Sequence, residues 1–230
     1  MFLPWIGLFE QIRLADCFVF YDDVQLSKGS FMSRVQIKTH SGIMWLSAPI
    51  DRALSGNLIN NSYFSLRQDW RSKHLKTLIH SYAKAPFFKL MYELASCIYS
   101  FPSNNLAEFN MNAIKHISSW LGLCPIYTKS SELNIPGRST QRLVDICNHF
   151  EAKTYITGLG GLNYIEYDKF EDSNIEVKYM KYAKKSYKQL HGEFTPYVTI
   201  LDAIANCGDS VKDLLCSDAI YWKEFTNGFN

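Results

Sequence analysis

Residues 18–31 read FVFYDDVQLSKGSF, and the first half of this stretch decides the fold class. The run from Cys17 to Tyr21 is apolar or aromatic throughout, as is typical of a buried β-strand. It ends directly in two acids, Asp22 and Asp23. Open α/β sheets place ligand and catalytic groups beyond the carboxyl ends of their strands, so a strand that ends in two acids fits an α/β fold and is a candidate site. A solvated turn that only ends the strand is the simpler alternative.

The composition excludes several classes of protein. The 230 residues are 47% hydrophobic and 15% aromatic, which is enough for a large core. A net charge of +2 gives no one-sided field for nucleic acid. Six cysteines without a C-x-x-C pair indicate free thiols and a cytoplasmic protein. No apolar run reaches the roughly 18 residues of a membrane span, and we find no metal-site or P-loop motif.

Periodicity predicts most of the elements. We expect a short helix over 4–15, a strand over 17–21, and a hairpin of strands 31–39 and 43–50 turning at Ser41–Gly42. Further helices are expected over 68–83, 86–100, 104–121, 139–150, 163–170, 195–208 and 209–216. Further strands are expected over 154–158 and 176–182, and a short strand followed by a loop over 125–133. We predict a single α/β domain spanning 1–230. It would have a mixed or mostly parallel sheet, flanking helices and a helical lobe around 68–121; two domains are the alternative.

The residues after the two acids extend the candidate site. Adjacent side chains of a strand point in opposite directions, so only one of Asp22 and Asp23 is expected to face a crevice. Gln25, Lys28 and Arg34 follow within a dozen residues. A carboxylate, an amide and two cations suit sugar hydroxyls, phosphate oxygens or a substrate amine.

The segment around Ser139, Gln141 and Arg142 begins a predicted helix. Free backbone N–H groups and the positive end of the helix dipole favour an anion there, so this segment is a candidate seat for phosphate or carboxylate. Alternatively, Ser139 caps the helix and the arginines are solvated.

A glycine turn and a loop histidine complete the candidates. Gly158 and Gly160 lie in a G-x-G-G turn that ends near Tyr164, a spacing that departs from a dinucleotide fingerprint. The turn permits close backbone approach to a ligand, or serves only as a tight turn. His191 stands in a Gly- and Pro-bounded segment just after Gln189, which makes it a candidate general acid or base.

Together these segments resemble the WbqC-like family. The resemblance is carried, in order, by FLPWIGLFEQIRLADCFVFYDDVQLSKGSF, RVQIK, WLSAPI, DWRSKH, SYAKAPFF, TYITG and YKQLHGEFTPYVTILDAIANCG. It implies cytoplasmic work on activated sugars of bacterial O-antigen and related polysaccharides. The family-like polar positions here are Asp22, Asp23, Gln25, Arg34, Trp45, Gln141, Arg142, Gly158, Tyr164, Gln189, His191 and Asp202. Ser33 and Leu159 depart from the family pattern, which also implies a strand ahead of Met1.

Our leading hypothesis is transfer of an acyl or aminoacyl group to the amine of a nucleotide-linked amino sugar. His191 or Asp22 would take the amine proton, Arg142 and the helix start at 139–142 would hold phosphate, and amides near Gly160 would stabilise the oxyanion. No motif assigns a cofactor. A nucleotidylyltransferase-like enzyme and a non-catalytic sugar-nucleotide-binding or assembly protein remain the alternatives.

Overall fold

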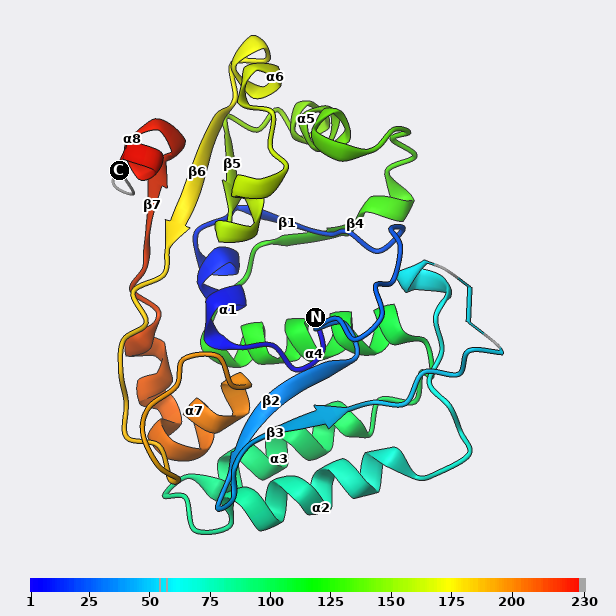
Figure 1. The fold of residues 1–230 in the computed structure, drawn as a ribbon, viewed down its shortest axis with the longest axis vertical. Coiled ribbons are helices and arrows are strands. Elements are labelled where there is room, and N and C mark those ends of the chain that lie inside the picture. Colours follow the sequence, from blue (N-terminus) through cyan, green and yellow to red (C-terminus); the bar gives the residue numbers. More distant parts are fainter. Residues whose placement is uncertain (54, 57, 228–230) are drawn as a thin grey trace. The chain divides into compact units, whose positions relative to one another are not determined.

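A computed structural model describes residues 1–53, 55–56 and 58–227 (Figure 1). The helices are α1 (Ile6–Arg13), α2 (Trp70–Tyr82), α3 (Phe88–Tyr99), α4 (Leu106–Leu121), α5 (Ser139–His149), α6 (Tyr167–Asp172), α7 (Ile200–Cys207) and α8 (Trp222–Asn227). The strands are β1 (Cys17–Phe20), β2 (Arg34–Thr39), β3 (Gly42–Ser47), β4 (Ile126–Lys129), β5 (Thr154–Thr157), β6 (Glu176–Lys181) and β7 (Asp218–Tyr221). The predicted α/β class is confirmed.

The described strands form three small sheets with both parallel and antiparallel pairs. β1 pairs with β4 in parallel, and β2 pairs with β3 as the predicted antiparallel hairpin. In the third sheet β6 lies between β5, which is parallel to it, and β7, which is antiparallel. Among the described residues, none of the helices is both long enough and apolar enough to cross a bilayer.

The chain divides into two compact units. The first contains Met1–Phe9, Asp22–Cys124 and Lys184–Leu215; the second contains Glu10–Tyr21, Pro125–Ala183 and Cys216–Asn230. The three predicted helices of the 68–121 lobe are α2, α3 and α4, and all belong to the first unit. That these units fold together as one domain stays a prediction.

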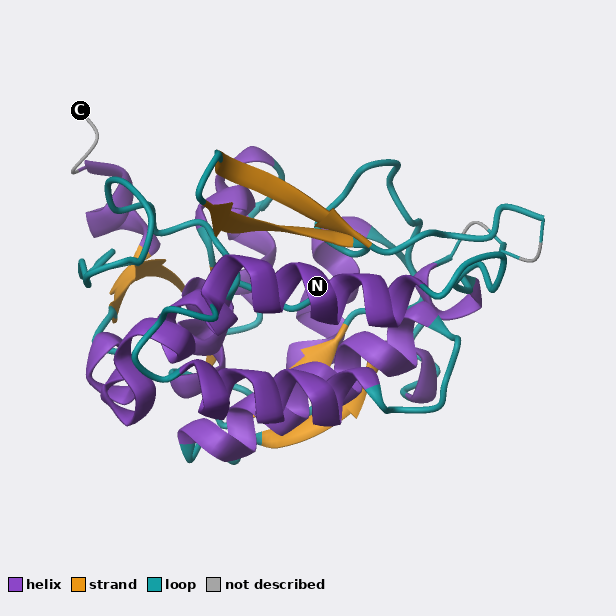
Figure 2. Cartoon of the chain, turned by 90° about the horizontal axis from the view of Figure 1, so that it is seen from below, coloured by secondary structure: helices purple, strands orange, loops and turns teal. Residues whose placement is uncertain are grey.

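In the first unit, the β2–β3 hairpin lies along a layer of helices that includes α2, α3 and α4 (Figures 1 and 2). Two hydrogen bonds from α2 fix the hairpin at opposite ends. At one end, Nε2 of His74 lies 3.0 Å from the carbonyl oxygen of Ser47. At the other, the backbone N–H of Lys38 donates to the Tyr82 hydroxyl at 3.1 Å. The hairpin is therefore held in register against the helical layer.

His74 lies within an aromatic cluster beneath the hairpin. Its Nδ1 is 2.9 Å from the Tyr99 hydroxyl, and its ring contacts Phe2 and Trp70 edge-on. The cluster's remaining rings are those of Phe64 and Phe109. Burial disfavours the imidazolium ion and lowers the pKa of His74 from 6.5 to about 4.

The second unit contains a buried carboxylate with several hydrogen-bond partners. Glu10 accepts hydrogen bonds from the backbone N–H groups of Cys216 and Ser217 at 2.8 and 2.9 Å, and from the Ser217 hydroxyl at 2.7 Å. The Nε of Arg13 donates to it at 3.1 Å. These bonds satisfy a carboxylate that has no solvent exposure, so they join α1 to the segment before β7.

Several details of the predicted helices are wrong. The helix predicted over 195–208 begins only at Ile200, and the one predicted over 209–216 is a 3-10 helix over Gly208–Leu214. Ser139 does not cap α5: the N-cap is Arg138, and Ser139 is the first helical residue, with a positive φ of 58°. Its hydroxyl is therefore one position too late for the capping bond. The helix predicted over 163–170 starts only at Tyr167, after a 3-10 turn over Leu159–Asn163.

The pKa of His74 makes the stability of the protein depend on pH. Since the folded-state pKa lies below the unfolded value, the neutral ring contributes its full stability above about pH 6.5 and loses it as the pH falls towards 4. We expect up to about 3 kcal/mol of the unfolding free energy to be lost across this interval. Urea titrations from pH 7 to 4 would measure the loss.

The control compares two histidines on the same helix. In His74→Gln the decrease between pH 6.5 and 4 should shrink, whereas in His80→Gln, on the exposed side of α2, it should persist. Equal pH profiles in wild type and His74→Gln would contradict the assignment.

Candidate functional site

One face of the β2–β3 hairpin carries its polar side chains. Alternate residues of a strand share a face, and Val35 and Ile37 are buried in the core. The opposite face, which we call the polar face, joins three cross-strand pairs: Arg34 with Ser47, Gln36 with Trp45, and Lys38 with Ile43. The sequence RVQIK thus gives β2 one apolar face and one polar face.

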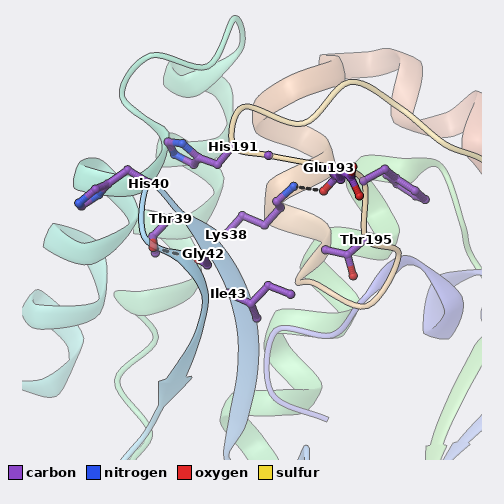
Figure 3. A pocket seen from close by; sticks show the side chains of 10 residues that line it. Lys38, Thr39, His40, Gly42, Ile43, His191, Glu193 and Thr195 are labelled. Atoms are coloured by element: carbon purple, nitrogen blue, oxygen red, sulfur yellow. Dashed lines mark hydrogen bonds between the residues drawn. The ribbon is translucent and has the colours of Figure 1, made fainter.

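Lys38 is the buried cation of the polar face. Only 4% of the residue is exposed. Its ammonium donates to Oε1 of Gln189 at 2.9 Å. It also donates to the backbone carbonyl of Glu193, a bond drawn in Figure 3. Burial lowers the pKa of Lys38, and the carboxylates of Asp202 and Glu193 act in the opposite direction. An ammonium has three donors, so one N–H has no partner among the described residues.

Gln189 connects Lys38 to the segment between β6 and α7, where no helix or strand is described. Its Nε2 donates to the Thr195 carbonyl at 2.9 Å, and its Oε1 accepts from the Thr195 backbone N–H at 3.0 Å. The same Nε2 donates to the Tyr187 hydroxyl at 3.0 Å. Because this one amide bonds Lys38, Tyr187 and Thr195, it fixes the shape of the loop as well as the position of Lys38.

Asp202 on α7 ends this hydrogen-bond chain. Its Oδ1 accepts from the Tyr187 hydroxyl at 2.7 Å, and the residue has no solvent exposure. Its Oδ2 makes no hydrogen bond of normal geometry to a described residue, although the Tyr82 hydroxyl is close enough to affect the carboxyl group. Burial raises the pKa of Asp202, and the Tyr187 hydroxyl and the charge of Lys38 oppose that rise.

Lys38 and His191 line a pocket of about 450 Å³ in the first unit (Figure 3). His40, Ile43, Glu193 and Thr195 contribute to its wall. Nε2 of His191 lies 2.7 Å from the carbonyl oxygen of Ser81. A carbonyl only accepts, so Nε2 carries the proton, and Nδ1 of the neutral ring is left as the acceptor. The pocket therefore contains a proton acceptor and a cationic donor.

The two acids that raised the first hypothesis lie elsewhere in the same unit. Asp22 is buried and Asp23 is partly exposed, and the Asp22 carbonyl accepts from the Asn60 backbone N–H at 2.9 Å. Gln25 is exposed and forms an isolated β-bridge with Leu58. None of these three lines the pocket around Lys38. Their roles stay predictions.

Six other candidates belong to the second unit: Ser139, Gln141, Arg142, Gly158, Gly160 and Tyr164. Arg142 is buried, with its Nε donating to the Ile135 carbonyl at 2.9 Å and its guanidinium over the ring of Tyr21. Gln141 is exposed and donates to Asp145 at 2.9 Å. These contacts occupy both side chains within the second unit.

The glycine turn of the second unit combines close and open positions. A Cβ on Gly158 would lie 2.6 Å from Nε2 of Gln11, the end of a flexible side chain. A Cβ on Gly160 would meet nothing within 4 Å, and Tyr164 is exposed. A Cβ on Gly161 of the same turn would likewise lie 2.9 Å from Oγ1 of Thr157, and close approach of this turn to a ligand stays a prediction.

The sequence reasoning found His191 and Gln189 but missed Lys38, Tyr187 and Tyr82. A signal existed for Tyr187, because it alternates with Gln189 and His191. Asp202, a lone acid in the apolar run ILDAIA, indicates a buried carboxylate that needs partners.

Comparison with known proteins identifies the family of the chain. A sequence model of the WbqC-like protein family matches residues 1–213. The chain belongs to the WbqC-like protein family. This WbqC-like chain is 29% identical over 222 residues to the uncharacterized protein Rv1507c of Mycobacterium tuberculosis (strain ATCC 25618 / H37Rv), covering 93% of this chain and 94% of that protein. No solved structure matches it. The family predicted from the sequence is confirmed, and the match includes the whole Lys38 cluster.

Replacing Tyr187 by phenylalanine tests this cluster. Tyr187→Phe removes the hydroxyl that donates to the buried Asp202, so we expect the unfolding free energy at neutral pH to fall by about 1–3 kcal/mol. Tyr197→Phe, at a half-exposed tyrosine of the same loop, should change it by less than about 0.5 kcal/mol. Chemical denaturation measures both, and equal losses would argue against the Tyr187–Asp202 bond.

Proposed function

We propose that this WbqC-like protein is a cytoplasmic transferase of bacterial surface-polysaccharide synthesis that moves an acyl or aminoacyl group onto the amine of a nucleotide-linked amino sugar. The observation that supports it best is that Lys38 and His191 line one pocket, and that each has a polar group without a bond to a described residue. The family resemblance supports the class of substrate.

Acyl transfer to an amine makes two demands on a site. The amine nitrogen forms a bond to the carbonyl carbon and must lose a proton, while negative charge develops on the carbonyl oxygen. In our proposal Nδ1 of His191 takes the proton and later passes it to the leaving group as the bond to that group breaks. The free N–H of Lys38 donates to the oxyanion.

The surroundings of the two residues suit these roles. The bond of His191 to the Ser81 carbonyl orients the ring and fixes its tautomer. Lys38 is held by Gln189 and Glu193, so little reorganisation is needed when the oxyanion forms. The neighbouring carboxylate of Asp202 favours the charged form of the lysine against the effect of burial.

Mass spectrometry of reactions with sugar nucleotides and acyl or aminoacyl donors tests the proposal. We expect a mass shift on the sugar that falls by about 10²–10⁴-fold in His191→Gln, because the general base is lost. Lys38→Met should reduce it by about 10²-fold or more, because the oxyanion loses a donor. His80→Gln, on the exposed surface of α2, is the control and should retain activity.

Other outcomes would assign the function differently. Loss of turnover in Asp22→Asn with full turnover in His191→Gln would transfer the role of base to Asp22. Binding of sugar nucleotides without turnover, under every donor tried, would favour a non-catalytic binding or assembly protein. Release of pyrophosphate from ATP or CTP would favour the nucleotidylyltransferase-like alternative.

A further inference from the structure

Arg34 lies on the polar face, four residues before Lys38 in β2, and has none of the partners that Lys38 has. Its guanidinium makes no hydrogen bond or ion pair to a described residue, and its Nε is buried without an acceptor. Leaving a buried donor unpaired costs free energy, so such a group in a folded protein calls for an explanation. An arginine placed only for packing would normally find carbonyl or carboxylate acceptors.

The guanidinium is nevertheless fixed in place. It lies over the ring of Trp45, 4.2 Å from the centroid, so cation–π attraction orients its plane. Gly29 borders it with a positive φ of 67°, and a Cβ there would lie 3.3 Å from Nη2. Glycine therefore meets the backbone requirement and keeps this edge of the guanidinium uncrowded. Lys28 in the same turn is exposed and adds positive charge.

Aromatic surface adjoins this cation. Trp45 is 38% exposed and Phe31 50% exposed, and their ring centroids are 5.7 Å apart. A fixed fork of N–H donors beside open ring surface matches a ligand that has an anion and a planar ring close together. A nucleotide has both, since a base stacks on aromatic or guanidinium planes and a phosphate accepts from arginine.

The register of the hairpin relates this place to the pocket. Arg34 and Lys38 project from the same face of β2, and four residues of strand span about 13 Å. We propose that Arg34 binds the diphosphate of a nucleotide and that Trp45 and Phe31 bind its base, with the attached sugar extending along the polar face towards Lys38 and His191. This inference rests on the proposed function for the sugar end, while the nucleotide end stands on Arg34 and Trp45.

The test uses nucleoside diphosphates and inorganic pyrophosphate as probes, with calorimetry and tryptophan fluorescence as readouts. We expect the wild type to bind at least one of UDP, GDP, CDP and dTDP. Arg34→Gln should weaken that binding at least 10-fold, and Arg34→Lys should restore little of it because the fork is lost. Trp45→Leu should weaken the nucleotide more than pyrophosphate. Arg67→Gln, at an exposed arginine of the same unit, is the control and should bind normally.

The outcomes separate this inference from the proposed function. If no nucleoside diphosphate binds the wild type, or if Arg34→Gln binds as tightly, the nucleotide subsite is overturned even where acyl transfer is seen. Binding that depends on Arg34 and persists in His191→Gln supports the subsite even where no transfer is found. Unchanged thermal unfolding of the Arg34 variants would show that lost binding is not lost folding.

Discussion

The hydrogen bonds of the buried Lys38 ammonium are the interactions on which the candidate site depends. Burying a charge is unfavourable unless it is paired and hydrogen-bonded, and Gln189, the Glu193 carbonyl and the nearby Asp202 meet that requirement together. Between β6 and α7, residues 184–199 form no helix or strand of their own. The shape of this segment therefore comes from side-chain bonds, and the loop that carries His191 is positioned by the lysine it surrounds.

The hairpin can hold the Lys38 ammonium because one of its faces packs on the core and the other carries the polar side chains. Val35 and Ile37 anchor it to the core, while His74 and Tyr82 of α2 fix its two ends. At the edge of β2 that does not pair with β3, Val198 forms a β-bridge with Gln36, and the Thr199 backbone N–H donates to the Gln36 carbonyl. That contact sets the start of α7 and hence the place of Asp202, so one strand determines both the cation and its counter-charge.

Local patterns predicted the elements well because each pattern has a local cause. The alternation in RVQIK and the Ser41–Gly42 turn gave the hairpin, and Gly208 ends α7 as expected. The prediction that Ser139 caps α5 was wrong because the backbone has a positive φ at this residue, which a serine in the sequence does not indicate. The residues of the candidate site were harder to predict from the sequence. His191, Gln189 and Arg34 stood out by residue type and resemblance, whereas Lys38 is an ordinary strand residue whose partners lie 151 and 155 positions away.

Lys38 and Arg34 show how an anchor differs from a binding group on a single surface. Both are cations on the same face of one strand. Lys38 has two acceptors and a carboxylate nearby, so removing it would disturb the loop that it holds. Arg34 has an aromatic ring and no acceptor among the described residues, so its position is set while its hydrogen-bonding capacity is unused. A group that is oriented but unsatisfied is what ligand binding requires, because the ligand then supplies the missing acceptors without reordering the protein.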